Sequence, residues 1–277
     1  MMTALRTIKK QGATPLLWTS ITTILLFGAC RQDQATSLDL QTASTKAGIG
    51  LIHFNTDHSI PLYRSSTDSL AFDSLQFTIE KSGKKRGQCK FVTQYLKDKL
   101  QPYIMDPGDS KEDGQKHLQM GLIHFAPQLT FRVSEKMENG VSIIINEKNS
   151  ETCFVRLNPK NNYAHGKDEN LIFFDPNFPD TEIDNWYLFE TWPQAILRAF
   201  LIQVPDSTPT YDAPNGNLRS FKALGNALFN ADSIYKDWVR IDNQTYLAEG
   251  DTVIKTWVRW IEHDSIKVFL TLNGGYE

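Results

Sequence analysis

Short apolar segments separated by turn-forming residues run through most of this sequence, and they constrain the fold more than any other feature. The segments are rich in Val, Ile, Phe, Trp and Thr, and Gly, Asn, Asp or Pro lies between them. This pattern is typical of β-strands joined by turns. We therefore expect a mainly β protein, with strands at residues 51–54, 75–79, 129–133, 141–145, 152–157, 172–174, 201–204, 238–241, 253–260 and 266–272.

Two stretches show helical spacing instead. In GQCKFVTQYLKDKL the apolar residues fall at positions 91, 92, 95, 96 and 100, near the spacing of one helical face. In ETWPQAILRAF, Thr191 can cap a helix and Pro193 is tolerated in its first turn. The sequence thus predicts a minor helical component, part of it in a segment around residues 80–125.

The sequence also contains a weak internal repeat. HSIPLYRSSTDSLAF matches DSTPTYDAPNGNLRSF, so Tyr63 corresponds to Tyr211. NGVSIII and TCFVRL match KDWVRID and KTWVRWI in the same order, with Val141 and Phe154 in the places of the two tryptophans. The first copy has about 51 additional residues between its tyrosine and the later strands. A repeat of this kind predicts two related domains, the first with an insertion.

The start of the chain has the composition of an export signal. A basic head with Arg6, Lys9 and Lys10 precedes a mostly apolar span over residues 15–29. Several hydroxyl residues interrupt that span, which falls short of the roughly 20 apolar residues that a membrane-spanning helix needs. We therefore expect residues 1–29 to be a signal peptide that is removed.

The residues Leu26-Phe27-Gly28-Ala29-Cys30 resemble the lipobox of bacterial lipoproteins, departing from it at Phe27, where that family usually has leucine. The resemblance implies that Cys30 becomes the lipidated first residue, carrying palmitate or a similar acyl chain that holds the protein on a membrane. Residues 30–47 would then be a flexible tether. Asp33 favours the outer membrane of a cell with two membranes. An ordinary secretory signal or an uncleaved anchor is the alternative.

Composition and charge limit the classes of partner that this chain can bind. With 40% hydrophobic residues the chain can form a packed core, and its formal net charge of −3 gives no general attraction to nucleic acid. The basic run EKSGKKRGQCK is followed by the acidic run DPGDSKEDG. We interpret these two runs as solvated loops of opposite sign, and we expect no nucleic-acid partner.

The second copy resembles the SH3-like barrels found in bacterial exported proteins (SH3b-type). The likeness lies in IQVPDSTPTYDAPNGN, KDWVRI, KTWVRW and IKVFLTL, and it extends faintly over residues 48–157. The loop sequence common in that family is replaced here by TYDAPNGN. The resemblance implies two small β-barrels that act as non-catalytic binding modules for peptidoglycan or a partner protein of the cell envelope.

The same resemblance implies a ligand-binding set along an aromatic groove. Aromatic rings supply much of the contact area in binding hot spots. A tryptophan on a short alternating strand is usually a core residue, so both interpretations stand for the two tryptophans. The positions that match the family's groove are Tyr211, Asp212, Pro214, Trp238 and Trp257.

Two cysteines remain in the exported part. Cys89 and Cys153 either form a disulfide, as an oxidising compartment favours, or are two free thiols. Cys89 would also begin the helix expected near residue 90, where a helix dipole favours a thiolate. It faintly resembles the nucleophile of cysteine peptidases that cleave cell-wall peptides, although Gln88 and Lys90 depart from that family's motif.

A cell-wall hydrolase using Cys89 is therefore the alternative to a binding module. A second alternative is a glycan-binding surface lipoprotein that uses exposed members of the set Trp186, Tyr187, Trp192 and Tyr211. The six histidines lack zinc-ligand spacing, and residues 109–120 lack the ligands of a calcium loop. We expect no metal and no cofactor.

The predicted layout has five parts. A signal peptide over residues 1–29 and a tether over 30–47 precede a first SH3-like domain at 48–174, whose insertion lies near 80–125. A helical linker at 175–200 leads to a second SH3-like domain at 201–277.

Overall fold

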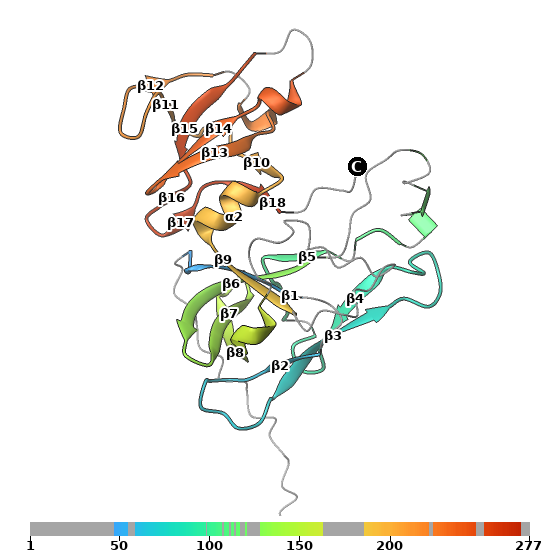
Figure 1. The fold of residues 1–277 in the computed structure, drawn as a ribbon. Helices are drawn as coiled ribbons and strands as arrows, with labels where there is room; N and C mark the ends of the chain where they lie inside the picture. Colours follow the sequence, from blue (N-terminus) through green and yellow to red (C-terminus); the bar gives the residue numbers. More distant parts are fainter. Residues whose placement is uncertain are drawn as a thin grey trace, which may run out of the picture. The chain divides into compact units, whose positions relative to one another are not determined.

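A computed structural model shows a mainly β protein (Figure 1). It describes residues 47–54, 59–97, 99–106, 108–110, 128–162, 186–221, 224–247 and 252–272, together with residues 112, 113, 115, 116 and 120. Cys30, the signal peptide, nearly all of the tether and the strand expected at 172–174 lie outside these residues. The expected strands that begin at residues 51, 75, 129, 141, 152, 201, 238 and 253 are confirmed within one to two residues at most ends.

The first half is built on one antiparallel sheet. Its hydrophobic core contains Ile52, Phe131 and Ile143, each with no exposed surface. The order of the sheet is β8 (Glu151–Arg156), β7 (Gly140–Asn146), β6 (Gln128–Met137), β1 (Gly50–Phe54) and β9 (Tyr187–Thr191), with β5 (Ile104–Asp106) also paired to β6.

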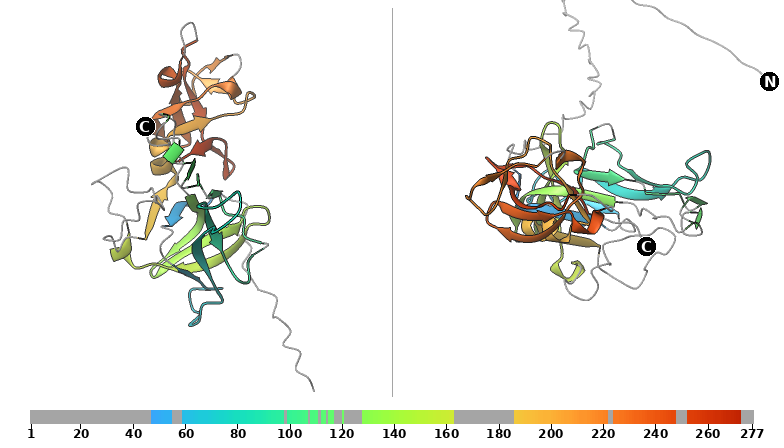
Figure 2. Two further views of the ribbon diagram at one scale, coloured as in Figure 1. Left: turned by 90° about the vertical axis from the view of Figure 1, so that its right-hand side faces the viewer. Right: turned by 90° about the horizontal axis from the view of Figure 1, so that it is seen from above.

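A second small sheet belongs to the same half. It consists of β2 (Ile60–Leu62), β3 (Asp73–Ile79) and β4 (Cys89–Val92), all antiparallel. Figures 1 and 2 show the β3–β4 hairpin beside the β6–β7–β8 strands rather than within them. The helix expected at 87–100 is therefore wrong, because residues 89–92 pair with β3 in extended form and the described residues from 93 to 100 form turns and bends. Leu96 and Leu100 still reach the core, from the turns that follow β4.

The second half has its own core, which includes Phe229, Val239 and Val258. β10 (Leu201–Gln203) pairs with β18 (Phe269–Thr271), and Ile202 bridges to Phe229 just before β13. β16 (Ile261–Glu262) and β17 (Ser265–Ile266) form a hairpin, so the strand expected at 266–272 is divided between β17 and β18. The main sheet has the order β12 (Leu218–Arg219), β11 (Thr210–Tyr211), β15 (Lys255–Arg259), β14 (Trp238–Asp242) and β13 (Asn230–Tyr235).

Residues 187–198, assigned above to a linker, belong to folded elements. β9 completes the first sheet beside β1, and the expected helix α2 (Trp192–Arg198) follows it directly. The Thr191 amide donates to the Gln194 side chain at 2.9 Å, and Pro193 occupies the first turn. Trp192 and Ile196 are buried in the second core, together with Leu51 of β1. The segment thus ties the first sheet to the second core.

The two halves share one strand order. The series β9–β1–β6–β7–β8 in the first half corresponds to β18–β10–β13–β14–β15 in the second. Tyr63 bridges to Phe154 as Tyr211 pairs with Trp257, so these correspondences from the repeat are confirmed. None of the described sheets closes on itself, so the fold class is β-rich without a hydrogen-bonded barrel.

The repeat aligns one position differently from the sequence comparison. Both meanders turn through two residues, and the pair Met137–Gly140 in the first half occupies the place of Tyr235–Trp238 in the second. The counterpart of Trp238 is therefore Gly140, and Val141 corresponds to Val239. Both valines are buried in their cores.

Candidate functional site

The aromatic residues expected to bind a ligand come together on one face of the second half's main sheet. Tyr211 pairs with Trp257, which pairs with Arg240, and Trp238 pairs with Arg259 in the neighbouring row. Side chains alternate between the two faces of a strand, so Val239 and Ile241 point to the core from between these residues. We call this surface the aromatic–arginine face, composed of Tyr211, Tyr235, Trp238, Arg240, Trp257 and Arg259.

Ring contacts organise the face. The Tyr211 and Trp238 rings meet edge to face, with centroids 4.9 Å apart and an interplanar angle of 88°. The Arg259 guanidinium lies 4.5 Å from the centroid of Trp238, and that of Arg240 lies 5.6 Å from Trp257. Both distances are within the range of cation–π attraction. These contacts hold the aromatic rings and the two cations in fixed positions next to one another.

Exposure separates the two tryptophans. Trp238 is only 4% exposed, so its ring is mainly a packing element. Trp257 and Tyr211 are half-buried, and Tyr235 is 51% exposed. The surface that a ligand can reach is therefore formed by Tyr211, Trp257 and Tyr235, with Trp238 beneath the first of them.

Asp212 and Pro214 lie in the loop between β11 and β12. The Asp212 carboxylate accepts hydrogen bonds from the backbone amide of Asn217 at 2.8 Å and from its side-chain nitrogen at 3.2 Å. These bonds lower the pKa of Asp212. At Gly216 a Cβ atom would lie 2.1 Å from an Asp212 oxygen. Asp212 is thus used to shape the loop that carries Tyr211, while Pro214 is half-buried beside it.

A hollow of about 300 Å³ adjoins the face. Tyr211 and Arg259 belong to both, and Pro205 and Pro209 also line the hollow. Glu262 and Lys267 also line the hollow and lie 3.9 Å apart, so their charges oppose each other. The hollow extends the aromatic surface into a groove of mixed polarity.

Carboxylates balance the cations around the face. Arg240 contacts Asp232 at 2.6 Å, and Lys255 contacts both Asp232 and Asp242 at 2.9 Å. These contacts lower the pKa of both carboxyls against the opposing effect of burial. A surface with paired charges of both signs favours a ligand of mixed polarity over a polyanion.

The other aromatic residues considered for glycan binding do not form a surface together. Tyr187 and Trp192 are 4% and 2% exposed, and the Trp192 indole donates to the Ala47 carbonyl at 3.1 Å. Trp186 stacks on Phe54 with centroids 5.9 Å apart. These three side chains pack in or against the cores, so the predicted glycan surface retains only Tyr211.

The structure distinguishes between the alternatives left open for the cysteines. Cys153 is a free thiol within the first core, so the disulfide with Cys89 is not formed. Burial raises the pKa of the Cys153 thiol. Cys89 begins strand β4 rather than a helix, which removes the helix-dipole argument for an activated thiolate. His117 and His124 lie outside the described residues.

Sequence reasoning missed a buried polar network. The Glu190 carboxylate on β9 accepts two hydrogen bonds from the guanidinium of Arg198 on α2, at 2.6 and 2.7 Å. It also lies 2.9 Å from His53 Nε2. The other ring nitrogen, His53 Nδ1, lies 2.9 Å from the Thr130 hydroxyl. Glu190 is 1% exposed, so this Thr–His–Glu arrangement has no access to solvent and serves to join β1, β6, β9 and α2. A histidine on a strand of otherwise apolar residues, GLIHF, was its only sequence signal.

No family model matches the chain, and no curated protein or solved structure is significantly similar to it. In the described ranges no three His, Cys, Asp or Glu residues gather into a group that could hold a metal ion. The part of the chain that the structure describes contains no helix both long and apolar enough to cross a membrane.

Proposed function

We propose that this protein is a lipoprotein of the bacterial cell envelope whose folded part is a non-catalytic binding module, with peptidoglycan or an envelope protein as its partner. The export signal and the lipobox at Cys30 support the location. The strand order of the second half, with a loop hairpin pairing onto the last strand of a meander, supports the resemblance to SH3-like domains.

One observation carries the binding part of the proposal. The aromatic–arginine face leaves Trp257, Tyr211 and Tyr235 in reach of solvent on a rigid sheet, whereas the corresponding face of the first half is covered. Rigid aromatic rings flanked by arginine are characteristic of binding hot spots. Arg240 is already paired with Asp232 at 2.6 Å, whereas Arg259 has only a 4.0 Å contact with exposed Asp237. The Arg259 guanidinium is therefore the group that complements a carboxylate, which the peptide stems of peptidoglycan and acidic protein segments both contain.

Sedimentation with purified peptidoglycan tests this proposal. The full exported chain should bind, and Tyr211→Ala should reduce the affinity by about tenfold or more, as expected for a hot-spot residue. Tyr63→Ala is the matched control, because Tyr63 occupies the place of Tyr211 in the first half. Equal loss of binding in both variants, or in neither, would contradict a site on the second half.

The partner class is decided by a second measurement. A photoreactive amino acid at position 235 on the face should cross-link to peptidoglycan fragments if the wall is the ligand. Cross-linking to one envelope protein that Trp257→Ala abolishes would identify a protein partner instead. For the anchor, Cys30→Ala should abolish incorporation of labelled palmitate and release the protein from the membrane fraction.

A further inference from the structure

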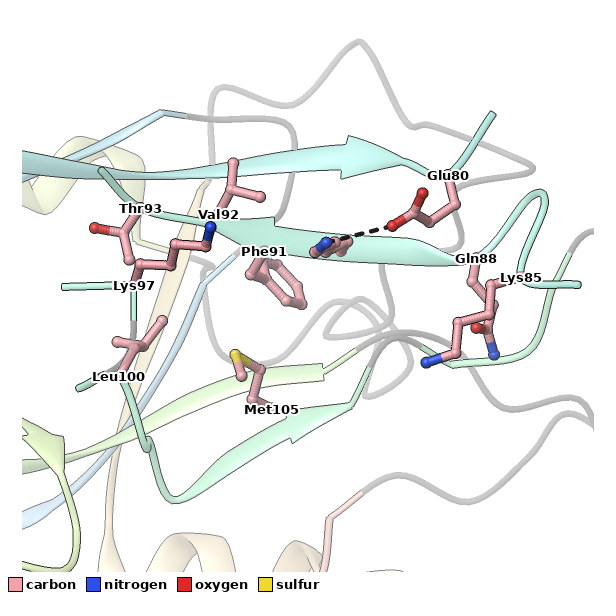
Figure 3. Close-up of a pocket in the computed structure, with 10 residues that line it drawn as sticks. Glu80, Lys85, Gln88, Phe91, Val92, Thr93, Lys97, Leu100 and Met105 are labelled. Atoms are coloured by element: carbon pink, nitrogen blue, oxygen red, sulfur yellow. Dashed lines mark hydrogen bonds and ion pairs between the residues drawn. The ribbon is translucent and has the colours of Figure 1, made fainter. Parts of the chain in front are cut away.

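The inserted part of the first half contains a hollow that lies apart from the aromatic–arginine face. Its volume is about 650 Å³, within the range of pockets that hold small molecules. Figure 3 shows it between β4 and β5, with the turns after β4 at one end. The second half has no counterpart of these strands in its shared strand order.

The floor of the hollow is apolar. Phe91 extends from β4 towards Met105 on β5, and Leu100 lies at one end (Figure 3). Phe91 and Leu100 are almost fully buried, whereas Met105 is 45% exposed. An exposed methionine opposite an aromatic ring gives an adaptable apolar surface, and its burial by a ligand would be favourable.

The rim is cationic. Lys85, Lys90 and Lys97 line the hollow, and Glu80 is the one carboxylate among the described residues that line it. Glu80 contacts Lys90 at 3.4 Å. Lys85 and Lys97 lie towards opposite ends in Figure 3, and neither makes an ion pair within the described residues.

This rim differs from the solvated loops expected from the sequence. Arg86, next to Lys85, does pair with the acidic run, contacting Glu112 at 3.1 Å. The two lysines over the apolar floor are not neutralised in this way, although the chain as a whole is acidic. Cationic ends on an apolar floor complement a molecule that is apolar in the middle and negatively charged.

The walls of the hollow are fixed before any ligand binds. The Asp73 carboxylate accepts the backbone amides of Gln94 and Leu96 at 3.0 Å and of Tyr95 at 2.9 Å, which shapes the turn that carries Lys97. At the other end the Gln88 side chain donates to the Gly108 carbonyl at 3.3 Å. A preformed site loses little free energy to ordering when a ligand enters.

We propose that this hollow binds a small anionic amphiphile, a molecule with an apolar body and a carboxylate or similar anionic group. The apolar body lies on Phe91, Met105 and Leu100, and the anionic group lies at Lys85 or Lys97. This site is independent of the proposed face on the second half.

A pair of dyes tests the proposal. Anilinonaphthalene sulfonate has an apolar body and one negative charge, and phenylnaphthylamine is the same body without the charge. The full exported chain should enhance the fluorescence of the sulfonate with one site per chain. Decanoate should displace it, and decanol should displace it much less well.

Two sets of variants locate the site. Lys85→Gln combined with Lys97→Gln should weaken sulfonate binding by roughly fivefold or more and leave phenylnaphthylamine binding unchanged, since each partly exposed ion pair contributes modestly. Lys148→Gln combined with Lys160→Gln, which removes two exposed lysines elsewhere, should change neither. Met105→Asp should weaken the binding of both dyes.

The proposal is overturned if the lysine pair and its control have equal effects, or if Met105→Asp leaves both dyes bound. Thermal unfolding of each variant shows whether it is folded, and Lys85→Gln and Lys97→Gln alter exposed side chains only. Trp257→Ala should leave dye binding unchanged. A negative result for the hollow can therefore be distinguished from a negative result for the aromatic–arginine face.

Discussion

The two halves of this protein have the same strand order, but the corresponding sheet face is covered in the first half and partly exposed in the second. In the first half β7 is buried at all seven positions, so both of its faces are covered. In the second half β14 alternates, with Arg240 and Asp242 only partly buried between core residues. A repeated topology therefore provides the scaffold, and the covering of its faces decides which copy can offer a binding surface.

The residue differences follow from this covering. Where the second half has Trp238 and Arg240, the first has Gly140 and Ser142. A Cβ on Gly140 would lie 2.1 Å from the Val155 carbonyl oxygen and 2.6 Å from the Phe154 ring, so the close approach needs glycine. The first half instead bears the β3, β4 and β5 insertion with its cationic hollow.

The largest effect is expected where the halves are joined. Glu190→Ala should lower the free energy of unfolding by about 3–5 kcal/mol, because it leaves Arg198 and His53 buried without their partner. Urea unfolding measures this. Glu112→Ala, which breaks the exposed pair with Arg86, should cost less than about 1 kcal/mol. Similar costs for the two variants would show that the network does not stabilise the junction.

The same network predicts a loss of stability in acid. Burial alone would raise the pKa of Glu190, but hydrogen bonds from His53 and Arg198 outweigh it and hold the pKa at about 2, below its usual 4.5. Burial lowers the pKa of His53 despite the opposing effect of Glu190. The unfolded chain therefore binds more protons at both groups. Stability should fall as the pH drops below about 6.5, and again between about 4.5 and 2. Glu190→Gln should reduce the second decrease, and the remainder comes from other carboxyls whose pKa is lowered, such as Asp73 and Asp232.

A smaller effect should distinguish the corresponding positions of the two meanders. Trp238→Ala should lower the free energy of unfolding by about 3 kcal/mol, because a buried ring is removed from between Tyr211 and Arg259. Gly140→Ala should cost about 2 kcal/mol for the opposite reason, since an added methyl group meets backbone. Thermal unfolding of both variants checks the correspondence. A Gly140→Ala variant as stable as the unchanged protein would contradict the correspondence between Gly140 and Trp238.

The smallest effect concerns the thiol of the first core. Cys153 should resist a thiol-specific reagent in the folded protein and react on unfolding, because burial both raises its pKa and blocks access. Cys153→Ser should cost about 1 kcal/mol by burying a hydroxyl group. Rapid labelling of Cys153 under native conditions, or a mass consistent with a disulfide in the unreduced protein, would contradict the structure.

Much of the fold was predictable from local pattern. Most strands, helix α2 and the correspondence of Tyr63 to Tyr211 in the repeat follow from alternation, capping residues and repetition. The segment GQCKFVTQYL was not predictable, because Val92 and Leu96 have the i, i+4 spacing of a helix while pairing with β3 makes residues 89–92 extended. Strand β9 was missed because its sequence, YLFET, has few β-branched residues and depends on β1 for its hydrogen bonds.

The candidate site was also predictable only in part. The sequence indicated Tyr211 and Trp257 as two members of a ligand-binding set, and the structure places them opposite each other on neighbouring strands. It could not show that Trp238 is covered by Tyr211, or that Trp192 is buried while Trp257 is half-exposed. Exposure depends on what packs above a residue, and that neighbour is often far away in the sequence.

By itself the sequence determined the β-rich class, the two related halves and the signal-like start with Cys30, because alternation, repetition and short motifs are local properties. Tertiary structure alone decided three things: that Cys153 is a buried free thiol, that His53, Glu190 and Arg198 meet, and that one half leaves its aromatic face open. Each depends on contacts between residues distant in the chain, which no local pattern encodes.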